Sequence, residues 1–127
     1  MATTKQIFNV TVGGSLRDSG ARAAAAMKAI SRGEKVQAHF GVNFEQIGQM
    51  LAAFTPKRWE LIAALRAAGP LTVAELARRL SRDYKNVHTD VNQLIEWMAV
   101  ERHEDGRVNV PWSEIVVDMK LPERAAA

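Results

Sequence analysis

The sequence lacks several features that would each have pointed to a definite class of protein. It contains no cysteine, which excludes a disulfide framework and a thiolate metal site. It has no stretch of about 18 apolar residues, the length that a membrane-spanning helix needs. Its net charge is only +3, so no strong field of one sign dominates it. Because 47% of the residues are hydrophobic, the chain can nevertheless bury a core and is not a disordered tail.

Motifs of catalytic and cofactor sites are also missing. Gly13-Gly14-Ser15 has neither the lysine nor the glycine spacing of a phosphate-binding loop. His39, His88 and His103 lie far apart and show no metal-ligand spacing. No nucleophile has a nearby base and an orienting group, so we expect no enzyme, no metal and no cofactor. The first residues lack the charged start and apolar core of a signal peptide, and we expect a cytoplasmic protein.

The strongest local signals lie between Leu71 and Pro111. Thr72 with Glu75 three residues later predicts a capping box at the start of a helix. Leu71 and Leu76 can close a hydrophobic staple around that start. The expected buried stripe of this helix is Val73, Leu76, Ala77 and Leu80.

A second helix is expected to begin after Asp83, a favourable N-cap residue. Its apolar positions recur at spacings of three and four: Tyr84, Val87, Val91, Leu94, Ile95 and Met98. The opposite face carries Lys85, Asn86, His88, Thr89 and Asn92. Amide, imidazole, hydroxyl and ammonium groups can reach base edges and phosphates, although an ordinary solvated helix face has the same composition.

The flanking segments favour the nucleic-acid interpretation. Thr55-Pro56 predicts the start of a preceding helix, with Phe54 and Trp59 as its staple, and Gly69-Pro70 predicts its end. Asp105-Gly106 lies between strand-like runs at residues 100–103 and 107–110, which predicts a hairpin. Three helices followed by a hairpin are the pattern of a winged helix-turn-helix.

The segments TPKRWELI, RDYKNVH and DGRVNVPW also resemble those of MarR/ArsR-like winged-helix regulators. The resemblance is closer to winged-helix proteins encoded beside TumE-type toxins and regarded as their antitoxins, and it spans about residues 44 to 121. It implies that Tyr84, Lys85, Asn86 and His88 lie in a recognition helix and Arg107 on the wing. Three departures from the family pattern are Thr89, where a basic residue is expected, and Ser81 and Met98, where glycine is frequent.

From these patterns we predict a DNA-binding surface. Arg82, Lys85 and the helix N-terminus are expected to hold phosphates, and Arg107 to probe the minor groove or the backbone. Four side chains are expected to read bases: Asn86, His88, Thr89 and Asn92. The complete predicted set is Thr72, Arg82, Tyr84, Lys85, Asn86, His88, Thr89, Asn92 and Arg107.

Charge is distributed unevenly along the chain. Residues 1–54 carry six Lys or Arg against three acids, whereas residues 55–127 carry eleven of each. A neutral DNA-binding half predicts modest non-specific affinity, because that affinity scales with the number of phosphates neutralised. A homodimer would double the contacts.

The first part of the chain predicts a strand-helix-strand unit. Ile7–Val12 alternates like a strand, a helix is expected from Ser15 to about residue 30, and 36–42 reads as a second strand with a possible bulge at Gly41. Asn43 is expected to start another helix, with Ile47, Met50, Leu51 and Phe54 buried. Two strands and one helix bury too little surface to be stable alone. A partner strand could come from residues 115–121 or from a second subunit.

The sequence therefore predicts an α+β protein, a winged helix-turn-helix with an N-terminal strand-helix-strand extension. Residues 1–54 would form a dimerisation or partner-binding region, 55–121 the DNA-binding domain and 122–127 a frayed tail. The predicted function is that of a transcriptional repressor that binds double-stranded DNA sequence-specifically as a homodimer. More specifically, we predict an autorepressing antitoxin of a type II toxin-antitoxin pair. The alternative is a module that binds a toxin protein, with DNA binding secondary or lost.

Overall fold

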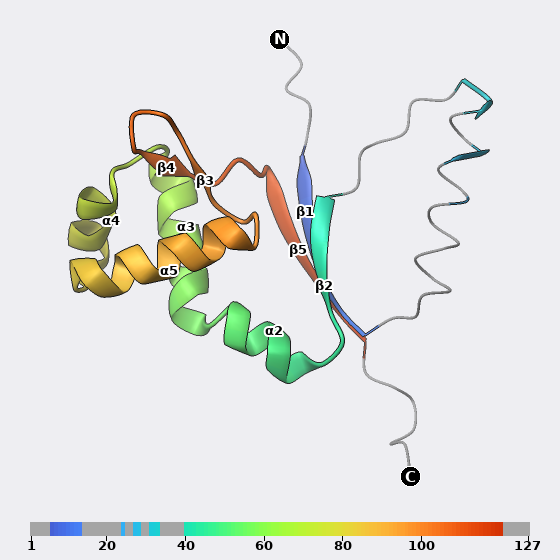
Figure 1. Cartoon of the computed structure of the whole chain (residues 1–127), viewed down its shortest axis with the longest axis horizontal. Coiled ribbons are helices and arrows are strands. Elements are labelled where there is room, and N and C mark those ends of the chain that lie inside the picture. The colour runs from blue at the N-terminus through green and yellow to red at the C-terminus, as the bar shows by residue number, and fades with distance from the viewer. Residues whose placement is uncertain (1–5, 14–23, 25–26, 29–30, 34–39, 121–127) are drawn as a thin grey trace.

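The computed structural model describes residues 6–13, 24, 27–28, 31–33 and 40–120 (Figure 1). Within them the protein is a mixed α+β fold of four helices and five strands. The expected helix beginning at Ser15 falls largely outside the described residues, as do positions 36–39 of the second expected strand and the tail 122–127. The elements are β1 (Ile7–Val12), β2 (Phe40–Phe44), α2 (Ile47–Ala53), α3 (Pro56–Ala68), α4 (Val73–Leu80), α5 (Tyr84–Glu96), β3 (Glu101–Arg102), β4 (Val108–Asn109) and β5 (Glu114–Met119).

The starts of three helices agree with the predicted caps. The Thr55 hydroxyl accepts a hydrogen bond from the Arg58 N–H at the start of α3. At α4, Thr72 and Glu75 form the predicted capping box, and the Thr72 hydrogen bonds to the carboxylate hold the pKa of Glu75 below its ordinary value. The Asp83 carboxylate accepts from the Asn86 N–H and caps α5. Side-chain acceptors thus satisfy backbone donors that a helix start leaves unpaired.

Helix α2 differs from the sequence-based prediction. Its N-cap is Gln46, which exchanges capping hydrogen bonds with Gln49, and not Asn43. Asn43 instead lies in β2, where its side chain is within 2.7 Å of the Thr11 hydroxyl. The expectation that Leu51 is buried is also wrong, because 49% of its surface is exposed. Met50 and Phe54 of the same expected stripe are buried.

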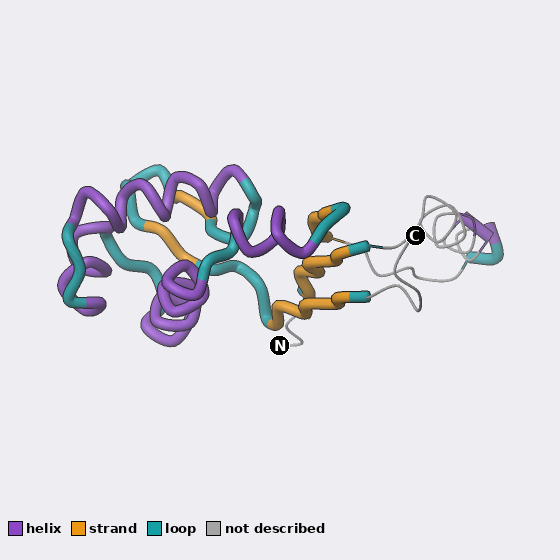
Figure 2. Tube along the Cα trace, turned by 90° about the horizontal axis from the view of Figure 1, so that it is seen from below, coloured by secondary structure: helices purple, strands orange, loops and turns teal. Residues whose placement is uncertain are grey.

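The main sheet joins both ends of the described chain. Its strand order is β2-β1-β5, and both pairs are parallel. Residues 114–119 therefore supply the partner strand that the N-terminal unit was expected to need. Figures 1 and 2 show all four helices on one side of this sheet. Parallel sheets are normally covered by other elements on their faces. These helices cover the face on which the buried residues of β1 lie.

The predicted bulge at Gly41 is absent. Gly41 faces Asn9 in an unbroken parallel register from Phe8↔Phe40 to Val12↔Phe44. A Cβ atom added to Gly41 would lie 2.2 Å from the Asn9 carbonyl oxygen. Glycine is used here because the two backbones approach closely, which is the other usual reason for glycine within a strand.

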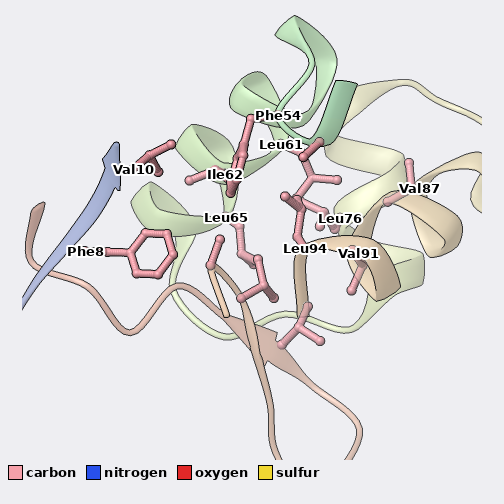
Figure 3. Close-up of a cluster of buried hydrophobic side chains, with 14 of the residues drawn as sticks. Phe8, Val10, Phe54, Leu61, Ile62, Leu65, Leu76, Val87, Val91 and Leu94 are labelled. Carbon is pink, nitrogen blue, oxygen red and sulfur yellow. The ribbon is translucent and has the colours of Figure 1, made fainter. Parts of the chain in front are cut away.

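One hydrophobic core connects the sheet to the helices. Phe8 and Val10 point from β1 toward Ile62 and Leu65 of α3 (Figure 3), and all four are buried. Trp112, in the segment before β5, packs on Phe8 with ring centroids 4.9 Å apart.

Aromatic contacts extend this core between the sheet and the helices. Trp112 Nε1 donates a hydrogen bond to the Met98 carbonyl at the exit of α5. Phe44 of β2 lies against Trp97, and Phe54 stacks on Trp59 with centroids 5.0 Å apart, which confirms the predicted staple. All three tryptophans are partly buried and pack against the core.

No helix in the described part of the chain is long and apolar enough to cross a membrane.

Among the described residues, two that are not glycine adopt left-handed backbone conformations. Ser81 ends α4 with φ 52°, and Met98 follows α5 with φ 67°. These are the two positions at which the resemblance to winged-helix proteins led us to expect glycine. A side chain is disfavoured there because its Cβ crowds the following carbonyl oxygen.

Replacing either Ser81 or Met98 with glycine is expected to raise the free energy of unfolding by about 0.5–1 kcal/mol, since relief of the left-handed conformation outweighs the added chain entropy. Both side chains are exposed, so little packing is lost. Thermal or urea unfolding measures the change. Ala63→Gly, in the exposed interior of α3, is the control and should destabilise by about 1 kcal/mol. Destabilisation by all three variants would contradict the prediction.

Candidate nucleic-acid interface

The predicted site residues divide into exposed and half-buried groups. Five of them are exposed: Tyr84, Lys85, Asn86, Thr89 and Arg107. The half-buried ones are Thr72, Arg82, His88 and Asn92. Seven of the nine lie on α5 or the turn before it, Thr72 is the N-cap of α4, and Arg107 lies on the β3–β4 hairpin. Figure 1 shows α4 beside the N-terminal end of α5 and the hairpin alongside the middle of α5.

The first two turns of α5 present the most accessible polar surface of this group. Neither the Lys85 ammonium nor the side-chain amide of Asn86 is hydrogen-bonded to another described residue. The Thr89 hydroxyl donates to the Lys85 carbonyl at 3.0 Å, which holds its rotamer against the helix. Behind this surface, Val87 and Val91 are fully buried and anchor the helix. The helix therefore offers an ammonium, an amide and a hydroxyl to solvent from a fixed backbone.

Tyr84 differs from its predicted place on the apolar stripe. Its side chain is 53% exposed and stacks on His88, with ring centroids 5.8 Å apart. The first turn of α5 extends beyond the core, so the apolar side of Tyr84 is covered by His88 instead. Met98, also expected in the stripe, is 55% exposed because it lies beyond the end of α5 in a left-handed turn.

A chain of polar contacts connects α5 to the hairpin. Asn92 Nδ2 lies 3.3 Å from His88 Nδ1, and Arg102 of β3 donates to Asn92 Oδ1 at 3.0 Å. Both ends of the Asn92 amide are thus occupied. This arrangement joins the hairpin to α5, and a base contact by Asn92, as predicted from the sequence, would have to compete with these two contacts.

Arg82 is held by an ion pair that the sequence did not reveal. Its Nη2 lies 2.8 Å from Asp90 Oδ2, and Arg58 Nε lies 3.1 Å from Asp90 Oδ1. Arg58 also donates to the Ala53 carbonyl at the end of α2. All three charged side chains are 14–18% exposed. Asp90 therefore connects α3, α5 and the α4–α5 turn, and Arg82 serves this connection in addition to any outside contact.

The hairpin turn is organised by its own acidic residue. The Asp105 carboxylate accepts from the Arg107 N–H and from Arg107 Nε. These bonds, the backbone one foremost, hold the pKa of Asp105 below its ordinary value. Gly106 takes φ 88°, as the Asp-Gly signal predicted. Arg107 is consequently exposed but already paired, so a phosphate would have to compete with Asp105 for its guanidinium.

Three residues important to this geometry were missed by sequence reasoning: Arg58, Asp90 and Arg102. Arg58 and Asp90 are 32 positions apart, and no local pattern predicts such a pair. One signal was present, because Asp90 directly precedes the buried Val91. A carboxylate at the border of an apolar stripe requires a partner.

In the described residues, no group of three or more histidine, aspartate or glutamate side chains is arranged to hold a metal ion. The fold and this surface define a small α+β protein whose accessible polar groups gather on one helix beside a hairpin. The chain belongs to the HVO_A0114 family, whose sequence model matches residues 53–117. That match runs from the end of α2 into β5. Comparison with curated proteins and with solved structures gives no match.

Proposed function

We propose that this protein is a sequence-specific regulator that binds double-stranded DNA. In this proposal α3, α4, α5 and the β3–β4 hairpin form a winged helix-turn-helix, and the N-terminal half of α5 enters the major groove. The observation that carries it is the exposed set Lys85, Asn86 and Thr89 on a helix whose other side is locked into the core. An asparagine can pair bidentately with adenine, and a rigid helix keeps it in register.

The charges around α5 support the same docking. Arg78 and Arg79 lie exposed in the last turn of α4, and Lys85 lies in the first turn of α5. These three basic residues flank the N-terminal end of α5, which would approach the sugar-phosphate backbone of the DNA. Glu96 lies at the C-terminal end of α5, and on the hairpin the acids Glu101, Glu104 and Asp105 alternate with Arg102 and Arg107. The basic groups at the N-terminal end of α5 favour entry by that end, and their small number implies modest affinity for random DNA.

Asn86→Ala is expected to weaken binding to the cognate site by about 1–3 kcal/mol and to relax specificity at one base pair. Lys85→Ala should weaken binding to all sequences and reduce the salt slope by about one. The measurement is a salt-titrated fluorescence anisotropy assay on DNA from upstream of the protein's own reading frame, with random DNA of equal length beside it.

Gln93→Ala is the matched control. Gln93 is an exposed amide on α5 two turns farther from the N-terminal end, and its loss should leave affinity nearly unchanged. Equal effects of the Asn86 and Gln93 variants would contradict the placement of the N-terminal turns in the groove. Binding of wild-type protein with no preference over random DNA would overturn the proposal as a whole.

The resemblance to winged-helix antitoxins extends this proposal. In the extended form the protein represses its own operon and neutralises a toxin encoded beside it. Resemblance of residues 44–121 is its support. Co-expression with the product of the neighbouring reading frame tests it, because growth should be restored only when this chain is present. Neutralisation without sequence-specific DNA binding would favour the alternative, a toxin-binding module.

A further inference from the structure

Strand β5 forms an edge of the main sheet. It pairs with β1 on one side, and no described strand pairs with its other side. Figure 2 shows no described helix or strand beyond this edge. An edge strand presents a row of backbone N–H and C=O groups that another strand can pair with. Natural edges are usually protected by proline, bulges or inward charges, and residues 114–119 contain no proline.

The side chains of β5 are apolar on the core face of the sheet, whereas its opposite face carries Val116 between the carboxylates of Glu114 and Asp118. Val116, Val117 and Met119 are 36%, 43% and 44% exposed. By register, Val117 and Met119 lie on the same face as the buried Val10 and Val12 of β1. The core face of the sheet therefore continues to this edge without being covered there. A neighbour that extends the sheet would cover both the backbone groups and this apolar row.

Two-fold symmetry restricts how a second copy could pair with β5. Identical edges related by a two-fold axis must run antiparallel. Because outward-pointing backbone groups alternate, only residues separated by an even number of positions can face each other. With Val116 on the axis, Glu114 would face Asp118 of the second copy. With Asp118 on the axis, two Asp118 carboxylates would face each other. Like charges directly opposite destabilise such a pair.

A different register removes these conflicts. With Val117 on the axis, Glu114 faces Lys120 of the second copy at both ends of the strand pair. Ile115 then faces Met119 of the second copy and continues the apolar row of the core face. Placing Ile115 on the axis instead would run the pairing past the start of the strand. Charge complementarity and apolar continuity thus select one arrangement.

We infer that the protein forms a two-fold symmetric dimer in which β5 pairs antiparallel with β5 of a second copy, with Val117 on the axis. The two three-stranded sheets become one six-stranded sheet. The interface lies in residues 114–120 and not in residues 1–54, where the sequence had placed dimerisation. It does not depend on DNA binding, so the two proposals can fail separately.

The absence of cysteine allows a direct test. Facing Cα atoms in an antiparallel pair are about 4.5–5.5 Å apart, within the range that a disulfide spans. Val117→Cys should therefore give a covalent dimer in most of the protein on mild oxidation. Val116→Cys is the control, because the two copies of residue 116 would be about 7–8 Å apart and beyond reach. Equal cross-linking of both variants would overturn the register.

Charge reversal provides a second test without oxidation. Lys120→Glu places two carboxylates opposite each other at both ends and should raise the dimer Kd roughly 10- to 30-fold. Adding Glu114→Lys to it should restore the wild-type Kd, whereas Lys57→Glu on α3 should not change it. Sedimentation analysis without DNA measures these constants. A wild-type monomer at every concentration, or a Kd insensitive to Lys120→Glu, would overturn the proposal and leave the edge for another protein chain.

Discussion

Asp90→Ala is expected to lower the free energy of unfolding by about 2–4 kcal/mol, one of the two largest effects predicted for this chain. The substitution leaves Arg58 and Arg82, which are 14% and 18% exposed, without their shared counter-charge. Arg82 Nη1 is already buried without a hydrogen-bond partner in the described residues, so Arg82 has no alternative acceptor at hand. Removing one partner of a poorly solvated ion pair costs more than the pair contributed, because the other charge stays unpaired.

Two control variants distinguish the loss of a buried ion pair from the loss of an exposed one in their effect on the free energy of unfolding. Asp105→Ala breaks a pair of the same 2.8 Å length, but Asp105 and Arg107 are each about half exposed. Its effect on urea unfolding should be much smaller, since water screens such pairs. Asp90→Asn keeps the shape and one acceptor oxygen and should lie between the alanine variant and wild type. An Asp90→Ala effect no larger than that of Asp105→Ala would refute the structural role of the network.

Phe8→Ala is expected to destabilise the protein by about 3–5 kcal/mol, the range for a large side chain removed from a close-packed core. Phe8 is fully buried on the central strand β1 and packs on Trp112. It lies where the sheet meets the helices, so the cavity would weaken contacts on both sides. Wild-type unfolding should therefore follow one transition, whether it is monitored by tryptophan fluorescence or by far-ultraviolet circular dichroism.

Phe40→Ala offers a control on the neighbouring strand. Phe40 pairs with Phe8 in the sheet and contacts the same Trp112 ring, with centroids 5.2 Å apart. Because 41% of its surface is exposed, its loss should destabilise by only about 1 kcal/mol. Similar losses for the two variants would show that the buried interface of β1 is not a principal source of stability.

Local chemistry explains why three helix starts were predictable from the sequence. Thr55, Thr72 and Asp83 each accept a hydrogen bond from a backbone N–H three residues later, so each signal lies within one helical turn. The Asp105-Gly106 hairpin is local in the same sense. The start of α2 was not predictable, because Asn43 is a favourable N-cap residue and Gln46, the observed N-cap, is not. The pairing of Asn43 with Thr11 across the sheet decided between them.

The candidate site was predictable only as a set of residues on one helix face. Their exposure follows from helical periodicity, and Lys85, Asn86 and Thr89 fit it. The engagement of Asn92 with Arg102 depends on where the hairpin packs, which no spacing along α5 reveals. The pairing of β5 with β1 could not be predicted from local sequence either, because residues 7 and 114 pair across more than a hundred positions.

That last pairing has a consequence for how the protein is made. The central strand β1 contains Phe8 and Val10, and it is synthesised before both of the strands that pair with it. Its partner β5 follows 107 residues later, an interval of about 5–20 s at ordinary rates of synthesis. Until then an apolar strand has one edge open. Completion of the sheet therefore has to wait for the synthesis of β5, and during this interval the nascent chain is exposed to wrong pairing.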